Sequence, residues 1–159
     1  MLTLKLLILV TAANGTPVII KKLLGQHLEL ALDGGLNFFD GRRLFGPSKT
    51  VRGVVSAILA TTLCAMLMEL EWYIGTVIGS ASIAGDLLSS FIKRRLNMPP
   101  SSMALGLDQV PESLLPLVVV QPLLPLTVMD IAAVVVIFSI GQLVLSRILY
   151  KLNIRDRPY

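Results

Sequence analysis

Five long apolar runs decide what this chain can fold into. Most of them approach the 20 or so residues that an α-helix needs to cross the hydrocarbon core of a bilayer. Only 15% of the residues are charged, against about 25% in soluble domains. The sequence therefore predicts an all-α integral membrane protein, a bundle of about five transmembrane helices in a single domain. The expected spans are residues 2–24, 51–68, 72–95, 113–129 and 131–152 of the domain 1–159. Because its start is apolar, the first run is expected to be a retained span and not a cleaved signal.

Two long loops, residues 25–50 and 96–112, alternate with gaps too short to be more than turns, so both loops are expected on one side of the membrane. Thirteen of the fourteen Lys and Arg residues fall on that side, including Arg155 and Arg157, and only Lys5 lies opposite. Cytoplasmic segments carry such an excess of basic residues. The pattern predicts a multi-pass cell-membrane protein with its N-terminus outside and its C-terminus and both loops in the cytoplasm. The net charge of +4 is explained in this way without a nucleic acid partner.

Helix-breaking residues interrupt two of the expected spans. The first contains the run 14–17, Asn-Gly-Thr-Pro, and the fourth contains Pro116, Pro122 and Pro125. Such breaks are tolerated in a membrane where neighbouring helices or a cavity satisfy the freed backbone groups. They indicate either a polar cavity or plain proline kinks.

Asp86 is the most informative polar residue. Together with Ser89, Ser90 and Lys93 it follows the spacing i, i+3, i+4, i+7, which places all four on one face of a helix. A carboxylate within the bilayer costs at least about 2.5 kcal/mol, so it is expected to face the interior of the bundle. The sequence leaves two interpretations, a functional site or an internal ion pair.

A second acidic stretch precedes the fourth span and contains Asp108, Gln109, Pro111 and Glu112. Proline and acidic residues are typical of the first turn of a helix, so capping is one explanation. The topology also brings Asp108 to the same side of the membrane as Asp86. Mg²⁺ is commonly held by one or two carboxylates together with substrate phosphates. A shared Mg²⁺ site is the alternative.

The first loop combines glycines with basic residues. Arg42, Arg43, Lys49 and Arg52 follow or flank its Gly-rich part, and glycines let backbone amides approach an anion. The loop is suited to binding substrate phosphates or to lying against anionic lipid headgroups. Together with the possible metal site, this basic loop indicates phosphoryl or nucleotidyl transfer to a lipid. Such a reaction needs no protein nucleophile, because a phosphate oxygen can attack and catalysis rests on positioning and charge neutralisation.

These stretches, in this order, resemble a known family. The motifs are Asp-Gly-Arg-Arg at 40–43, Lys-Thr at 49–50, Gly-Asp at 85–86, Lys-Arg-Arg at 93–95 and Asp-Gln at 108–109. They resemble the archaeal CDP-archaeol synthases, a short branch of the membrane cytidylyltransferases. The Gly-His-Gly-Gly run of the longer cytidylyltransferases is replaced here by residues 105–109, so no histidine contact is carried over.

The resemblance implies a CTP:2,3-di-O-geranylgeranyl-sn-glycero-1-phosphate cytidylyltransferase. Such an enzyme transfers CMP from CTP to an isoprenoid ether lipid phosphate and releases pyrophosphate, with Mg²⁺ as cofactor. Catalytic roles are expected for Lys49, Asp86, Lys93 and Asp108, and Mg²⁺ ligands are expected to be Asp86 and Asp108. Substrate contacts are expected from Asn14, Asn37, Asp40, Arg43, Ser48, Thr50, Arg52, Ser89, Ser90, Arg94, Gln109 and Glu112.

Two other functions would use some of the same features. A CTP-dependent polyprenol kinase would use similar carboxylates and cations but would transfer the γ-phosphate. A small membrane transporter could use broken helices and a buried acid as a solute site near the midplane. The crowding of polar residues at one end of the spans argues against the transporter.

Overall fold

The computed structural model describes residues 2–25 and 27–152 and contains five α-helices. A single 3-10 turn, Gln121–Leu123, follows the fourth helix, and the described residues form two isolated β-bridges but no strand. The helices are α1 Leu2–Leu24, α2 Val51–Leu67, α3 Trp72–Arg95, α4 Gln109–Val120 and α5 Val128–Lys151. The expected all-helical class is confirmed.

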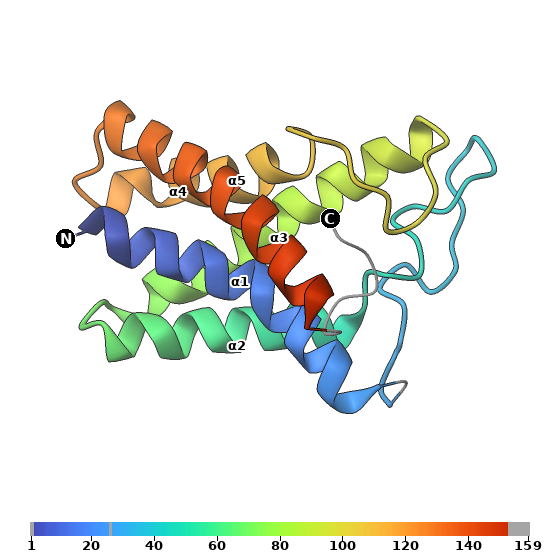
Figure 1. Cartoon of the computed structure of the whole chain (residues 1–159), viewed down its shortest axis with the longest axis horizontal. Coiled ribbons are helices and arrows are strands. Elements are labelled where there is room, and N and C mark those ends of the chain that lie inside the picture. Colours follow the sequence, from blue (N-terminus) through green and yellow to red (C-terminus); the bar gives the residue numbers. More distant parts are fainter. Residues whose placement is uncertain (1, 26, 153–159) are drawn as a thin grey trace.

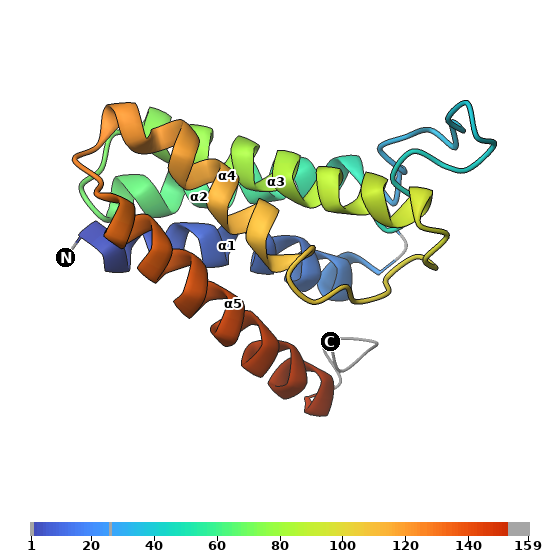
Figure 2. The same ribbon diagram turned by 90° about the horizontal axis from the view of Figure 1, so that it is seen from above.

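The helices lie along one long axis, and both long loops emerge at the same end of the bundle (Figure 1). Helix α3 packs against α1, α2 and α4. Helix α5 starts beside the end of α4 and then leans away from the other helices (Figure 2). The apolar core lies between the helices and includes Leu6 and Leu9 of α1, Ile74 and Ile78 of α3, and Leu117 of α4.

Glycines in α3 allow two neighbouring helices to approach its backbone. A Cβ at Gly75 would lie 2.7 Å from Thr62 Cα of α2, and a Cβ at Gly85 would lie 2.8 Å from Glu112 Cα of α4. Both distances are shorter than real Cβ contacts allow. Close approach through small residues is typical of helix packing in membranes. Here it brings α2 and α4 onto opposite ends of the polar face of α3.

Three helices, α1, α3 and α5, are long and apolar enough to cross a membrane. Helix α2 is apolar but shorter, with 17 residues, and α4 has 12. A membrane protein is thus confirmed, while a count of five crossings stays a prediction.

The structure corrects several expected helix boundaries. Helix α1 keeps its expected bounds and is continuous through residues 14–17, including Pro17, where Asn14 donates to Val10 O within the helix. The expected span 113–129 begins earlier and ends earlier, at α4 Gln109–Val120, because Pro122 lacks the N–H that would extend the α-helix. The second loop therefore ends at residue 108 instead of 112.

The last helix also begins before its expected start at residue 131, because Thr127 and Asp130 form a capping box ahead of it. Helix α2 ends one residue early and α5 ends at Lys151. Other expected boundaries, including the first loop at residues 25–50, agree with the structure. Arg155 and Arg157, counted in the charge asymmetry, lie outside the described residues.

Candidate functional site

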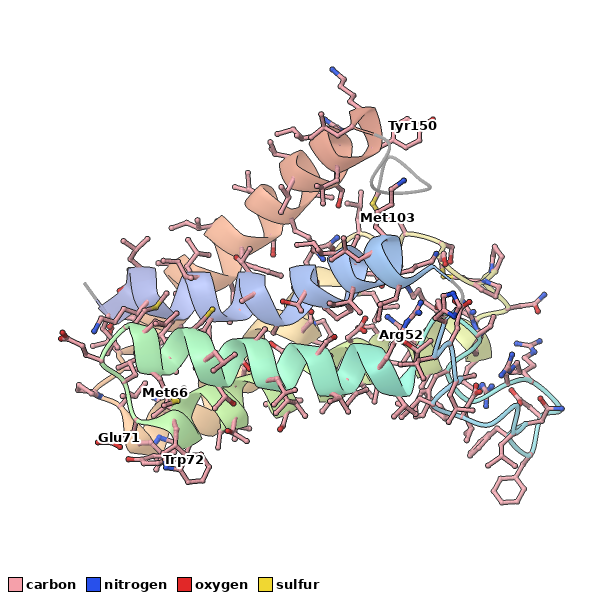
Figure 3. All side chains as sticks on the ribbon, turned by 90° about the horizontal axis from the view of Figure 1, so that it is seen from below. Arg52, Met66, Glu71, Trp72, Met103 and Tyr150 are labelled. Carbon is pink, nitrogen blue, oxygen red and sulfur yellow. The ribbon has the colours of Figure 1, made fainter. Side chains whose placement is uncertain are left out.

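A cavity of about 490 Å³ lies at the end of the bundle that carries the loops. This is within the range of about 300–1,000 Å³ that is usual for small-molecule sites. Figure 3 shows Arg52 and Met103, which line it, at that end, whereas Met66, Glu71 and Trp72 lie at the opposite end. Twelve of the sixteen predicted site residues line this cavity: Asn14, Ser48, Lys49, Thr50, Arg52, Asp86, Ser90, Lys93, Arg94, Asp108, Gln109 and Glu112.

Lys49 and Asp86 join the first loop to the middle of the site. Lys49 Nζ lies 2.6 Å from both carboxylate oxygens of Asp86, and both side chains keep about a quarter of their surface exposed. Thr50 caps the start of α2 by accepting a hydrogen bond from Gly53 N, which fixes the backbone next to Lys49. Asp86 therefore has the internal ion pair that the sequence allowed, and it also lines the cavity, so its functional role stays a prediction.

Lys93 and Asp108 form a second ion pair at the cavity wall. Lys93 Nζ lies 2.6 Å from Asp108 Oδ1 and donates to Ser102 O at 2.9 Å. Asp108 Oδ2 accepts a hydrogen bond from Ala104 N at 2.8 Å. Asp108, immediately before α4, thus stabilises the fold of the second loop and also lines the cavity.

Glu112 is nearly buried, at 4% exposed, where α3, α4 and α5 meet. Its Oε1 accepts a hydrogen bond from Gln142 Nε2 of α5 at 2.5 Å, and its backbone carbonyl accepts one from Ser82 Oγ of α3 at 2.9 Å. The close approach of α4 at Gly85 places this carboxyl next to the Asp86 side of the cavity.

Four predicted residues lie outside the cavity wall, and each has a structural partner. Arg43 Nη2 contacts Asp33 Oδ1 at 2.6 Å, and Asn37 pairs with Arg43 in a β-bridge. Asp40 Oδ2 lies 3.0 Å from Arg95 Nε. Ser89 donates to Leu107 O at 2.6 Å and so ties the second loop to α3. The geometry gives no support for a direct substrate contact by any of these four.

Several cavity residues were not identified from the sequence. Gln142 and Ser146 lie four residues apart on one face of α5 and reach the cavity from the far end of the chain. Their helical spacing within an otherwise apolar helix is the sequence feature that could have identified them as facing the interior of the bundle. The remaining polar or sulfur-containing residues of this kind are Lys21, Glu29, Ser101, Ser102 and Met103.

A second, smaller cavity of about 200 Å³ lies between α1 and α5 and is mostly apolar. Its lining includes Leu7, Phe138 and Leu145, and it shares Asn14, Val18, Gln142 and Ser146 with the large cavity. A polar chamber therefore adjoins an apolar groove, and the four shared residues form the boundary between them. This arrangement suits one polyanionic substrate and one amphiphilic substrate.

The large cavity is lined by side chains of both charges. Five cationic side chains, Lys21, Lys49, Arg52, Lys93 and Arg94, face four acidic ones, Glu29, Asp86, Asp108 and Glu112. Their formal charges nearly cancel, which leaves little to offset a triphosphate alone. Carboxylates and phosphates are the ligands that Mg²⁺ prefers. Among residues 2–25 and 27–152, no group of three or more His, Cys, Asp or Glu side chains gathers as a complete metal cage.

The chain is similar to known proteins over most of its length. A family model described as "CarS-like: CDP-archaeol synthase" matches residues 2–71 and 68–159. A CDP-archaeol synthase of Pyrobaculum calidifontis is 36% identical over 152 residues, covering 92% of this chain and 90% of the relative. One from Pyrobaculum aerophilum is 32% identical over 152 residues, covering 92% and 91%.

A solved structure, described as an intramembrane enzyme for archaeal membrane lipids biosynthesis, is similar to the whole bundle. It has a TM-score of 0.72 and 28% sequence identity, and the match covers 88% of this chain and 89% of that one. The resemblance inferred from the sequence motifs is confirmed.

Proposed function

Because the chain belongs to the CarS-like family of CDP-archaeol synthases, we propose that it forms CDP-archaeol by transferring CMP from CTP to an unsaturated archaeol phosphate. Formation of CDP-archaeol by a transferase follows from the family. The nucleotide donor, the geranylgeranyl chains of the acceptor, the metal and the roles of individual residues are the further content of the proposal.

The observation that carries the proposal is the junction of the two cavities. The polar chamber holds five cationic side chains that, together with Mg²⁺ at its carboxylates, would neutralise a triphosphate, while the adjoining groove between α1 and α5 is mostly apolar. A lipid phosphate would place its headgroup at the four shared residues and its chains along the groove. Neither the kinase nor the transporter alternative is favoured by the family or by the geometry.

In the proposed reaction, an oxygen of the lipid phosphate attacks the α-phosphorus of CTP in line. The bond between that phosphorus and the bridging oxygen breaks, and pyrophosphate leaves with the electron pair. Asp86 and Asp108 would hold Mg²⁺, which supplies charge neutralisation when bound. Lys49 and Lys93 are already placed at these carboxylates, 2.6 Å away in each pair, and offer their ammonium groups to the phosphates that develop charge.

Other residues position the reactants. Arg94 is mostly buried at the cavity wall, and its Nη2 is held by Pro99 O at 2.8 Å, which leaves a guanidinium fixed near the phosphates. Arg52, Ser48 and Thr50 line the first-loop side. Gln109 accepts from Gly106 N at 2.8 Å and keeps the second loop folded over the chamber. Proximity of this kind accounts for a large part of catalysis where the nucleophile is already ionised.

The membrane orientation is also a proposal. If the loops face the cytoplasm, as the basic residues favour, CTP would enter the chamber from the compartment in which it is made, and the acceptor lipid would come from the surrounding bilayer. Single cysteines placed in the first loop and next to Trp72 would test this by labelling with a membrane-impermeant maleimide on intact cells.

The activity is tested with CTP carrying radioactive labels on the α or the γ phosphorus. Purified protein with the ether lipid phosphate and Mg²⁺ is expected to move the α label, and not the γ label, into the lipid fraction. Transfer of the γ label would instead establish a kinase. Asp86→Asn is expected to lower kcat about 10²- to 10³-fold, as loss of one charge-stabilising group does elsewhere. Undiminished turnover would refute its metal role.

A further inference from the structure

The first loop contains a buried carboxylate that the proposed mechanism does not use. The side chain of Asp33 has no exposed surface, and the residue does not line either cavity. Its Oδ1 accepts from Gly35 N at 3.1 Å and from Arg43 Nη2 at 2.6 Å. Its Oδ2 accepts from Phe45 N at 3.2 Å and from Gly46 N at 2.9 Å. Four donors converge on one carboxylate, which is more than closing a turn at 33–35 requires.

The two bonds to Oδ2 fix the backbone that carries Lys49. Gly46 O accepts a hydrogen bond from Lys49 N at 3.3 Å, so residues 46–49 form a turn whose first amide is held by Asp33. The other end of the turn is held by the neighbour of Asp33, because Leu32 N donates to Lys49 O at 2.7 Å. Both ends of the turn are therefore attached to residues 32–33. Phe45, Ser48, Lys49 and Thr50 of this segment all line the chamber.

The same segment also contacts Arg94, which the proposed mechanism places near the phosphates. Gly46 has a φ of +96°, and a Cβ there would lie 3.1 Å from Arg94 Nη1. The guanidinium of Arg94 thus rests against the backbone that Asp33 holds, while its Nη2 bonds to Pro99 O of the second loop. Displacement of residues 45–46 would move Lys49 and disturb Arg94 together.

We propose that Asp33 is a positioning residue for the nucleotide: its buried carboxylate holds residues 45–49 so that Lys49 and Arg94 face the phosphates of CTP. This inference rests on the proposed function. Asp33 touches no substrate and acts through the loop backbone. Its substitution should therefore weaken the binding of the nucleotide and not that of the lipid. The lipid is proposed to occupy the groove between α1 and α5, which Asp33 does not line.

The first test is Asp33→Asn, assayed for transfer of the α label at varied CTP and varied lipid phosphate. The amide keeps the size of the side chain but turns one acceptor into a donor that faces backbone N–H groups. The KM for CTP is expected to rise about tenfold, as loss of ground-state binding does, with the KM for the lipid phosphate unchanged. A merely structural role would lower the amount of active enzyme and leave the KM for CTP at its wild-type value.

A second variant reaches the same contact without touching Asp33, in case Asp33→Asn does not fold. Gly46→Ala adds a Cβ against Arg94 and is expected to raise the KM for CTP as well. Gly41→Ala is the matched control, because Gly41 also has a positive φ, +74°, but a Cβ there meets nothing within 4 Å. Gly41→Ala thus carries the same backbone strain and is expected to keep the wild-type KM.

The outcomes separate the inference from the proposed function. A wild-type protein that moves no α label into lipid refutes the proposed function. A wild-type protein that does so, while Asp33→Asn and Gly46→Ala keep its KM for CTP, overturns the positioning role of Asp33. An equal rise in KM for Gly46→Ala and Gly41→Ala overturns it too, because the contact with Arg94 would then be irrelevant.

Discussion

Substitution of Gly85 by alanine should damage the active site without changing any group that touches a substrate. Gly85 precedes Asp86 on α3 and faces the start of α4. A Cβ at this position would lie 2.5 Å from the carbonyl carbon of Pro111, 2.8 Å from Glu112 Cα, and closer still to the Pro111 carbonyl oxygen. These are backbone atoms of a neighbouring helix, so no side chain can rotate away to make room.

The size of the effect follows from these distances. Ordinary van der Waals contact begins at 3.4 Å, and the carbonyl carbon of Pro111 lies 2.5 Å away with its oxygen closer still, so α4 must move away by at least about 0.9 Å. That movement carries Asp108, Gln109 and Glu112 away from Asp86. A misplacement of about 1 Å can lower a rate about 10²-fold, which corresponds to about 2.7 kcal/mol. Overpacking by one methyl group also costs about 1–3 kcal/mol of stability.

A matched variant separates the two effects. Gly75→Ala adds the same methyl group to the same helix, and its Cβ would lie 2.7 Å from Thr62 Cα of α2. This clash pushes against α2, toward the end of the bundle opposite the loops. Both variants should lose a similar amount of thermal stability. Thermal unfolding can be monitored by the fluorescence of the single tryptophan, Trp72. Transfer of the α label should fall about 10²-fold for Gly85→Ala and stay close to wild type for Gly75→Ala.

A Gly85→Ala protein that is destabilised as much as Gly75→Ala but keeps full activity would refute this prediction. In that case α4 could retreat from α3 without loss, and the juxtaposition of Asp86 with Asp108 and Glu112 would not matter to the reaction. Equal losses of activity in the two variants would also contradict it, because the damage would then come from instability alone.

Three more outcomes follow from particular contacts. Lys93→Met, which removes the partner of Asp108 but keeps the aliphatic stem, should lower kcat about 10²-fold or more, whereas Lys93→Arg should retain part of the activity; equal rates for Met and Arg would contradict a charge-dependent role. Burial raises the pKa of Asp33, but hydrogen bonds from Gly46, Gly35, Arg43 and Phe45 outweigh it and lower the pKa to about 2 from 3.8. Its ionised form therefore stabilises the loop by about 2 kcal/mol above pH 4, and that contribution should disappear as the pH falls from about 4 to 2; hydrogen exchange at residues 45–49 measures this, and Asp33→Asn should abolish the pH dependence. Thr127→Ala removes the cap of α5 at the end of the bundle opposite the loops and should cost about 1 kcal/mol of stability while the transfer rate is unchanged, as thermal unfolding and the label assay would show.

The sequence predicted best those features that depend on local patterns. Long apolar runs predicted the helices. The i, i+3, i+4, i+7 spacing predicted that Asp86 and Lys93 share one face of α3, and both line the cavity. The end of α4 was misplaced, because residues 121–129 are as apolar as a helix, and only the lack of an N–H at Pro122 and Pro125 marks the turn.

The features that the sequence did not reveal depend on the packing of distant segments. Asp33 belongs to an Asp-Gly-Gly run that is typical of any turn, and its four converging donors come from residues up to 13 positions away. Gln142 reaches Glu112 across 30 positions of chain. Sequence spacing cannot express either contact, because the first exists only when the first loop has folded back on itself and the second only when α4 and α5 have packed together.

The shared wall of the chamber and the groove has an energetic consequence for the lipid. A soluble enzyme acting on such a molecule must lift its chains out of the bilayer, at about 0.8 kcal/mol for each methylene group, or about 8 kcal/mol for ten of them. With the proposed placement of the reacting headgroup at Asn14 and Gln142 and of the hydrocarbon in the groove between α1 and α5, no such extraction would be needed. The acceptor then diffuses in two dimensions and the nucleotide in three. The product can return to the membrane sideways while pyrophosphate returns to water.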